Sequence, residues 1–238
     1  VAYDPAYAYE LAHIIKDGLR RMYGENAEDV FYYITMYNEP YPQPALPENA
    51  DIEGILRGIY KLSEGHGDGP RAQVLASGVA VPWALQAQSM LREEWGVVAD
   101  VWSVTSWNEL RNDGLACDRE ALLNPGAPKR TAYVTQALTG AQGPFIAVSD
   151  WMRAVQDQIR QWVPGDYATL GTDGWGMSDT RGALRRHFLV DAQSIVVRTL
   201  ASLAERGEID AATVEQAVAR YRLAEPAAAD AGNTEGSG

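Results

Sequence analysis

A glycine-flanked aspartate, Gly67-Asp68-Gly69, is the first combination of residues in the sequence that could bind a metal ion. An Asp in such a triplet, followed about 25–30 residues later by an Asn, supplies the oxygen ligands with which proteins hold Mg²⁺ against a diphosphate. Here 38 residues separate Gly69 from the next asparagine, Asn108, and the triplet precedes a predicted strand instead of following one. We therefore interpret Gly67-Asp68-Gly69 as a flexible turn and not as a metal site.

The densest polar and glycine-rich cluster is the loop from Gly171 to Asp179, whose glycines permit unusual backbone angles or the close approach of another surface. Ser178 or Asp179 could cap a helix that begins near Thr180, which is a structural role. In the alternative interpretation the loop faces a ligand or a neighbouring subunit. No Gly-Lys-Ser/Thr sequence follows, so the loop does not match a phosphate-binding loop.

The histidines and the cysteine offer few further candidates for chemistry. His13, His66 and His187 have no metal-ligand spacing, and of these only His187, which follows two arginines, is a candidate for a functional contact. Cys117 is the one cysteine of the sequence, so no internal disulfide is expected, and no base flanks it to activate a nucleophile. We predict no catalytic, cofactor-binding or metal-binding residue in this chain, because no general acid, general base and nucleophile form a complete set.

The composition of the 238 residues, with 46% hydrophobic and 22% charged side chains, is that of an ordinary soluble globular protein. A net charge of −12 speaks against nucleic acid and anionic membranes as partners, because their recognition needs clustered positive charge. No apolar run approaches about 18 residues, so we expect no transmembrane helix. The single cysteine and the lack of a signal peptide indicate a reducing, cytoplasmic compartment.

The first 38 residues predict one helix and one strand. Asp4 is expected to cap the helix, which ends at Gly24, and residues 30–37 are expected to form a buried strand because they are aromatic and β-branched. One helix and one strand are too little to bury a core. Since the chain also opens without Met, we expect residues 1–38 to end a domain whose other part lies upstream of Val1.

Residues 39–53 are predicted to be a linker, because four prolines between Asn38 and Pro47 remove backbone donors and stiffen the chain. A second domain is expected over residues 54–224, where strand and helix patterns alternate. Its strands are expected at 58–62, 72–77, 99–105, 143–149 and 167–170. Its helices are expected over 82–95, after Ser106, from Asp150 onward, and behind caps at Asp191 and Asp210. Residues 225–238 are rich in Ala, Gly, Ser and acidic residues and predict a disordered tail.

The alternation of strands and helices predicts an α/β fold with a mostly parallel sheet covered by helices. In such sheets the functional loops lie at the carboxyl ends of the strands. These loops are Gly78–Ala80, Ser106–Asn108, Asp150–Trp151 and Gly171–Gly174.

Several segments together resemble the homodimeric pyruvate dehydrogenases, the thiamine-dependent first component of that complex. Tyr3–Glu10 and Tyr32–Thr35 with Asn38-Glu39 resemble the last helix and strand of its pyrimidine-binding (middle) domain. Segments that resemble its transketolase-type C-terminal domain are Asp100–Ser106, Gly171–Gly176, Ser178-Asp179 and Arg206–Asp210. The match runs from Val1 to about Leu223 with order and spacing kept. Trp175 and Met177 depart from it, because Phe and Arg are common at those positions.

The resemblance implies a dimeric bacterial cytoplasmic enzyme that decarboxylates pyruvate on thiamine diphosphate with Mg²⁺. It implies that the acetyl group passes to the lipoyl acyltransferase component of the complex. The family's cofactor and catalytic residues all lie upstream of the matching segments, and none is carried over to this chain. We expect the segment itself to support dimerisation and the packing of the cofactor domains, with Asp173, Ser178 and His187 bordering a substrate channel or an interface.

Two other interpretations of the sequence stay open at this stage. One is a related thiamine enzyme, either transketolase or the first component of 2-oxoglutarate dehydrogenase, because all share this C-terminal fold and differ in upstream pocket residues. The other is a free-standing, non-catalytic α/β binding or dimerisation module. An upstream sequence with a correctly spaced Gly-Asp-Gly and Asn would decide for the enzyme.

Overall fold

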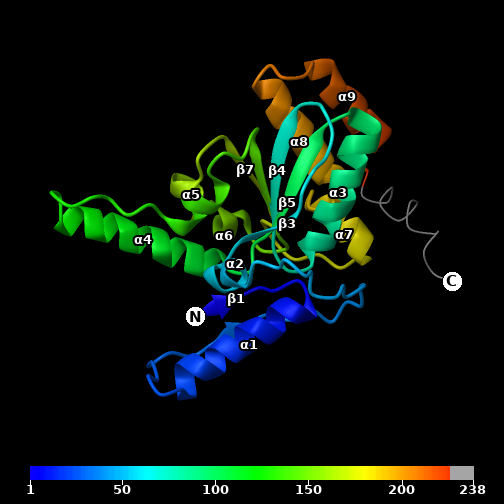
Figure 1. Cartoon of the computed structure of the whole chain (residues 1–238). Helices are drawn as coiled ribbons and strands as arrows, with labels where there is room; N and C mark the ends of the chain where they lie inside the picture. The colour runs from blue at the N-terminus through cyan, green and yellow to red at the C-terminus, as the bar shows by residue number, and fades with distance from the viewer. Residues whose placement is uncertain (226–238) are drawn as a thin grey trace.

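A five-stranded sheet forms the centre of the structure, a computed structural model that describes residues 1–225 (Figure 1). The strand order is β3-β5-β4-β6-β7. The parallel strands are β4 (Arg71–Ala76), β5 (Val98–Ser103), β6 (Phe145–Val148) and β7 (Tyr167–Leu170), and β3 (Tyr60–Ser63) is an antiparallel edge. All of β5 is buried, as expected for a parallel sheet covered on both faces. The predicted α/β fold is confirmed.

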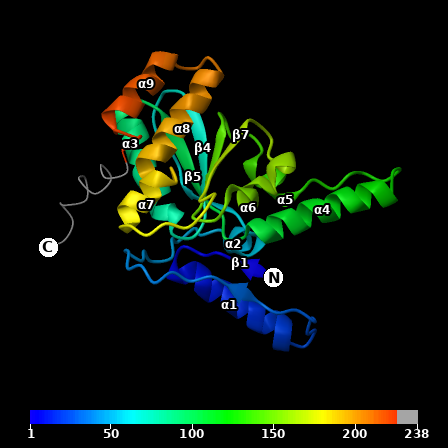
Figure 2. The same cartoon turned by 180° about the vertical axis from the view of Figure 1, so that it is seen from behind.

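Helices cover both faces of this sheet (Figures 1 and 2). One face carries α3 (Ala80–Trp95), α8 (Ala192–Glu205) and α9 (Ala211–Arg220), and the other carries α4 (Trp107–Leu123), α5 (Tyr133–Leu138), α6 (Arg153–Asp157) and the 3-10 turn η1 (Arg160–Trp162). Side chains of β4 alternate between the two cores, since Val74 and Ala76 pack with the first set of helices and Leu75 with the second. Burial of a side chain the size of Val74 or Leu75 contributes about 1.5–3 kcal/mol.

The strand predicted at 58–62 begins later, because a short helix precedes it. Helix α2 (Ile52–Arg57) starts behind the Asp51 carboxylate and ends at Gly58, which has φ +107°. A side chain at Gly58 would also meet the Ser106 carbonyl oxygen at 2.7 Å. The last two residues of the predicted linker 39–53 are therefore helical, while the division of the chain into two domains stays a prediction.

Three of the predicted helix caps are confirmed. Ser106, Asp191 and Asp210 each accept a backbone N–H from the first turn of α4, α8 and α9 at 2.9–3.0 Å. The helix expected from Asp150 begins three residues later, at Arg153. Caps act between neighbouring residues, which is why residue type and position alone were sufficient to predict them.

The cap predicted for α7 (Arg181–His187) is wrong by one or two residues. The hydroxyl of Thr180 accepts the N–H of Ala183 at 3.2 Å, so Thr180 is the cap. Asp179 instead accepts the Thr180 N–H at 2.8 Å, and Ser178 lies exposed in the preceding loop. Thr180 is the cap instead of the two predicted residues because it directly precedes the helix, where its hydroxyl can accept a first-turn N–H.

The cap predicted for the first helix is also wrong. Helix α1 (Ala8–Tyr23) begins after Tyr7, and Glu10 accepts the free N–H groups of Ala6 and Tyr7 at 2.6 and 3.0 Å. Asp4 lies too far upstream to reach them and bonds to distant side chains instead. Glu10 is fully buried, and its second oxygen accepts the hydroxyls of Tyr60 (2.7 Å) and Ser103 (2.6 Å) from the sheet.

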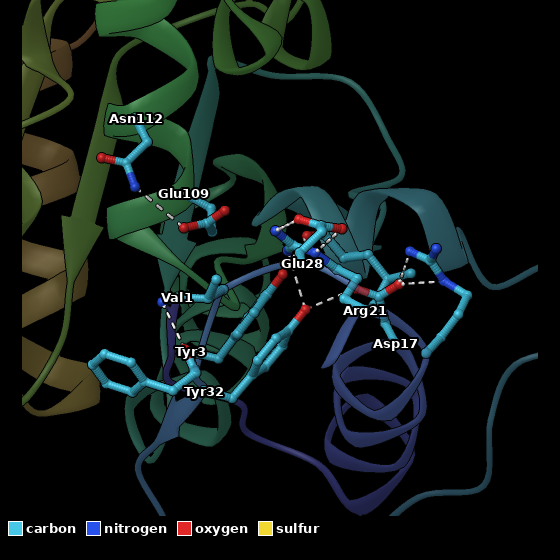
Figure 3. Close-up of polar contacts among 11 residues, drawn as sticks. Val1, Tyr3, Asp17, Arg21, Glu28, Tyr32, Glu109 and Asn112 are labelled. Carbon is cyan, nitrogen blue, oxygen red and sulfur yellow. Dashed lines mark hydrogen bonds and ion pairs between the residues drawn. The ribbon is translucent and has the colours of Figure 1, made fainter. Parts of the chain in front are cut away.

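The strand expected over residues 30–37 is short and mostly exposed. β2 (Tyr33–Ile34) pairs in parallel with β1 (Ala2–Tyr3). The rings of Tyr32 and Tyr3 stack with their centroids 5.9 Å apart, and the two side chains lie beside each other in Figure 3. Tyr32 donates to Asp17 of α1 at 2.9 Å and accepts from Arg21 at 3.1 Å. The predicted burial of this strand is wrong. Helix α1 covers only one face of the two-stranded ribbon, and within residues 1–225 the side chains of Phe31, Tyr33 and Met36 are 60–75% exposed.

Among residues 1–225, no helix is long and apolar enough to cross a bilayer. The tail predicted to be disordered falls, from residue 226 onward, outside the described residues.

We expect Glu10→Ala to lower the free energy of unfolding by about 3–5 kcal/mol, because it leaves four buried donors without an acceptor. Urea denaturation followed by circular dichroism measures this change. Glu25→Ala is the matched control: Glu25 is exposed just beyond α1, and its loss should change stability by less than about 0.5 kcal/mol. Equal effects of the two substitutions would contradict the anchoring role of Glu10.

Candidate functional site

The loops that follow the parallel strands meet at the carboxyl edge of the sheet, and residues 37–39 cross over that edge. A cavity of about 450 Å³, here called the edge cavity, lies between this crossing segment, α7 and the loop after β7. The residues that line it are Tyr37, Asn38, Glu39, Val79, Trp83, Asp150, Thr172, Gly174, Gly176, Met177, Arg181, Leu184, Arg185, Phe188 and Val190.

The buried carboxylate of Asp4 ties the N-terminal segment to this edge. Its Oδ1 accepts the hydroxyls of Thr35 at 2.5 Å and Tyr37 at 2.7 Å. Its Oδ2 accepts the hydroxyl of Ser77 at 2.7 Å and the indole N–H of Trp151 at 3.1 Å. Four donors satisfy the lone pairs of an ionised carboxylate, which offsets the cost of burying its charge.

The Tyr37 hydroxyl lies between two carboxyl groups and has one proton to share. Its oxygen is 2.7 Å from Asp4 Oδ1 and 3.0 Å from Asp150 Oδ1. When Asp150 is protonated, Asp150 donates to Tyr37 and Tyr37 donates to Asp4, so that every contact holds one proton. Burial, followed by the charge of Asp4, raises the pKa of Asp150 to about 6, while the hydrogen bond with Tyr37 and, less strongly, the charge of Arg185 oppose this shift.

Two arginines of α7 form the charged side of the edge cavity. Arg185 pairs with Glu39, and its guanidinium lies 4.4 Å from the centre of the Trp83 ring. Arg181 is held more loosely: its Nε is 4.0 Å from Glu39, one terminal nitrogen is 3.3 Å from the Asn38 side-chain oxygen, and its side chain is 58% exposed. Arg181 therefore keeps donors available for another anion.

The three candidate contact residues lie around this cavity without lining it. Asp173 pairs with Arg153 at 2.5 Å, which lowers the pKa of its carboxyl. Ser178 is exposed beside the lining residues of the loop, and His187 packs its ring edge-on against Phe188 at 4.9 Å. The structure thus brings the neighbours of these residues together in the cavity wall, but not their own side chains.

The glycine-flanked Asp68 lies far from Asn108. Gly67-Asp68-Gly69 precedes β4 and therefore lies at the amino edge of the sheet, whereas Asn108 follows β5 at the carboxyl edge. The six-residue strands between these edges are about 20 Å long, so the two side chains cannot share one ion. Within residues 1–225, no three His, Cys, Asp or Glu side chains are grouped so as to hold a metal. Cys117 is buried, and this burial raises the pKa of its thiol.

Sequence reasoning missed Asp4, Tyr37 and Arg185 as residues of this edge. Asp150 was placed there by the rule that functional loops follow strands, but its partner Tyr37 lies 113 residues away. Arg181 and Arg185 could have been found from the sequence, since their i, i+4 spacing places both on one face of α7. The direction of that face follows only from the packing.

We expect Asp150→Asn to flatten the pH dependence of stability between pH 4 and 7. The raised pKa means that the folded protein holds a proton that the unfolded chain releases, so this stabilising contribution is present below about pH 4 and is lost as pH rises through 6. Its full size is about 3 kcal/mol. Urea denaturation at several pH values measures the free energy of unfolding of wild type and variant. As pH rises, the stability of Asp150→Asn relative to the wild type should increase.

Asp173→Asn is the control, because the pKa of Asp173 is shifted in the opposite direction to that of Asp150. Arg153 lowers the pKa of Asp173, so its stabilising effect is present at neutral pH and fades as pH falls below the ordinary range of an aspartate. Stability curves of wild type and Asp150→Asn that stay parallel from pH 4 to 7 would contradict the shared-proton arrangement.

Comparison with known families gives two matches in the order of the chain. Residues 58–191 match the transketolase-like TK C-terminal domain, and residues 1–44 match the pyruvate dehydrogenase E1 component middle domain. Both agree with the resemblance drawn from the sequence, and the larger match covers more than half of the chain.

Similar curated proteins carry the name pyruvate dehydrogenase E1 component. The chain is 58% identical over 236 residues to that of Mycobacterium tuberculosis, 57% over 230 residues to that of Mycolicibacterium smegmatis and 47% over 224 residues to that of Escherichia coli. These alignments cover 99%, 96% and 94% of this chain. The chain spans about a quarter of the length of these relatives.

Solved transketolases share the fold at low sequence identity. The enzyme from Leishmania mexicana superposes with a TM-score of 0.56 at 16% identity, over 86% of this chain and 25% of that one. A transketolase from Pichia stipitis gives a TM-score of 0.57 at 18% identity, over 87% and 26%. These structures confirm the predicted transketolase C-terminal-like fold. The family match over residues 58–191 shows that the chain belongs to the family of the transketolase-like C-terminal domain.

Proposed function

We propose that this chain is the C-terminal quarter of a pyruvate dehydrogenase E1 component, an enzyme that decarboxylates pyruvate on thiamine diphosphate and reductively acetylates a lipoyl domain. The observation that carries this proposal is the 57–58% identity, over almost the whole chain, to two relatives with that name. The middle-domain match that precedes the C-terminal-domain match supports the same order of domains.

The residues of this chain do not fit thiamine diphosphate with Mg²⁺. The one glycine-flanked aspartate, Asp68, and the following Asn108 lie at opposite edges of the sheet, so they cannot bind one diphosphate-bound ion. The proposal therefore places the reacting groups of the enzyme in residues outside this chain. We derive no chemical step from the residues described here.

The proposed role of this segment is to support dimerisation and the packing of the cofactor domains. The support for it is the exposure of apolar side chains along α1 and the β1–β2 ribbon, because contiguous exposed apolar surface marks a contact site. Such side chains are Ile15, Leu19, Tyr23, Phe31, Tyr33 and Met36. The proposed partners are a second copy of the enzyme and the lipoyl acyltransferase component, in the bacterial cytoplasm.

We expect the chain by itself to show no binding heat with thiamine diphosphate and Mg²⁺ in calorimetry, because its own residues do not fit that cofactor. The same chain extended upstream to the full length of its relatives should bind the cofactor and release CO₂ from pyruvate. Micromolar binding by the chain alone would overturn the placement of the reactive centre. A full-length protein that binds thiamine diphosphate without consuming pyruvate would overturn the proposed substrate.

Asp173, Ser178 and His187 are proposed to border the substrate channel or an interface in the full-length enzyme. Alanine at each position should lower the rate of acetyl transfer to a lipoyl domain by about threefold or more, because positioning losses outside the reacting groups are of this order or larger. Arg119→Ala on the exposed side of α4 is a control that should change nothing. Three variants with wild-type turnover and acetyl transfer would remove these residues from the site.

A further inference from the structure

The edge cavity has the position and size of a small-molecule site. It lies outside the carboxyl ends of β4, β6 and β7, where parallel α/β sheets bind their ligands. Its volume of about 450 Å³ falls within the range of ordinary ligand pockets. The inference drawn from this cavity does not depend on the proposed pyruvate chemistry.

The cavity is lined by both apolar and charged side chains. Val79, Leu184, Phe188 and Val190 contribute aliphatic and aromatic surface, which suits the body of an apolar ligand. The charged lining residues are Arg181 and Arg185 of α7 against Glu39 and Asp150, so the arginines exceed the carboxylates by one positive charge when Asp150 is protonated. A lining of this kind with one excess guanidinium matches a ligand that has one negative charge and an apolar body.

Arg181 is the guanidinium with donors to spare. Arg185 is occupied by Glu39 and stacked on Trp83, whereas Arg181 touches the same carboxylate at 4.0 Å and remains 58% exposed. A planar guanidinium can hold a carboxylate through two parallel hydrogen bonds. Arg181 can therefore take an additional carboxylate without breaking the pair between Arg185 and Glu39.

We propose that the edge cavity binds a small monocarboxylate with an apolar body, its carboxylate on Arg181 and its body against Leu184 and Phe188.

Asp150 makes this binding depend on pH. The charged and titratable groups that face it are Asp4 and Tyr37 from the N-terminal segment and Arg185 from α7, and Glu39 and Arg181 line the same cavity. Protonated Asp150 leaves the cavity with one excess positive charge, and ionised Asp150 cancels it. Because the pKa of Asp150 is about 6, binding of an anion should weaken as pH rises through that value.

The test uses benzoate and its neutral counterpart benzamide as probes of the whole 238-residue chain. Binding is measured by titration in ¹H–¹⁵N NMR spectra, which report the Trp83 indole and the backbone of α7. Benzoate should shift these signals and bind at least about tenfold more tightly than benzamide at pH 5, which corresponds to the loss of one charged contact. Benzoate binding should weaken between pH 5 and 7.5 in the wild type and keep its strength in Asp150→Asn.

Two substitutions of charged lining residues should change the affinity for benzoate in opposite directions. Arg181→Gln should weaken benzoate binding by about tenfold, and Glu39→Gln, which removes the competing carboxylate, should strengthen it by several-fold. Arg119→Gln on the exposed face of α4 is the matched control and should leave binding unchanged. Equal binding of benzamide and benzoate, unaltered binding in Arg181→Gln, or shifts confined to another region of the chain would each overturn the proposal. Circular dichroism of every variant shows that a loss of binding is not a loss of folding.

Discussion

The buried carboxylate of Asp4 is the contact on which the arrangement of the carboxyl edge depends. Its four donors come from the segment after β2, the loop after β4 and the loop after β6. The loop after β5 joins through Trp107, whose indole donates to the Ser77 hydroxyl at 3.0 Å. Removing any one partner would leave a buried polar group unsatisfied, so these loops hold one another in place. A single charge thereby fixes segments that are as much as 147 residues apart.

Glu10 has the corresponding role in the first turn of α1, and the two carboxylates together set the edge cavity. Glu10 joins the start of α1 to Tyr60 of β3 and Ser103 of β5, which fixes the helix against the sheet. Asp4 draws Tyr37 toward the loop after β6, and the next residues, through Glu39, then lie opposite α7. The cavity wall formed by this crossing segment is thus a consequence of two buried charges and not of local backbone preference.

The sequence predicted what depends on neighbours in the chain and missed what depends on distant ones. The strands β4 to β7 follow from short runs rich in apolar and β-branched residues, and the caps at Ser106, Asp191 and Asp210 follow from a side chain beside its own helix. Asp4 has the local pattern of a cap, but its partners lie 31 to 147 residues away. The exposure of Phe31 and Met36 has the same cause, because burial depends on what packs across a strand. For the site, the rule on strand ends located Asp150, while Tyr37 and the orientation of Arg181 required the packed structure.

The shared proton of Tyr37 links the docking of the N-terminal segment to the state of the edge cavity. Protonated Asp150 completes the chain of hydrogen bonds to Asp4, whereas ionised Asp150 faces a hydroxyl whose proton is already given to Asp4. A negative charge placed in the cavity favours the protonated form and so favours the complete chain. Because linkage is reciprocal, the free energy by which an anion in the cavity favours protonated Asp150 is also the free energy by which protonation of Asp150 favours that anion. The hydrogen bonds from Tyr37 to Asp4 and Asp150 and the proposed anion site beside Arg181 are therefore coupled through Asp150.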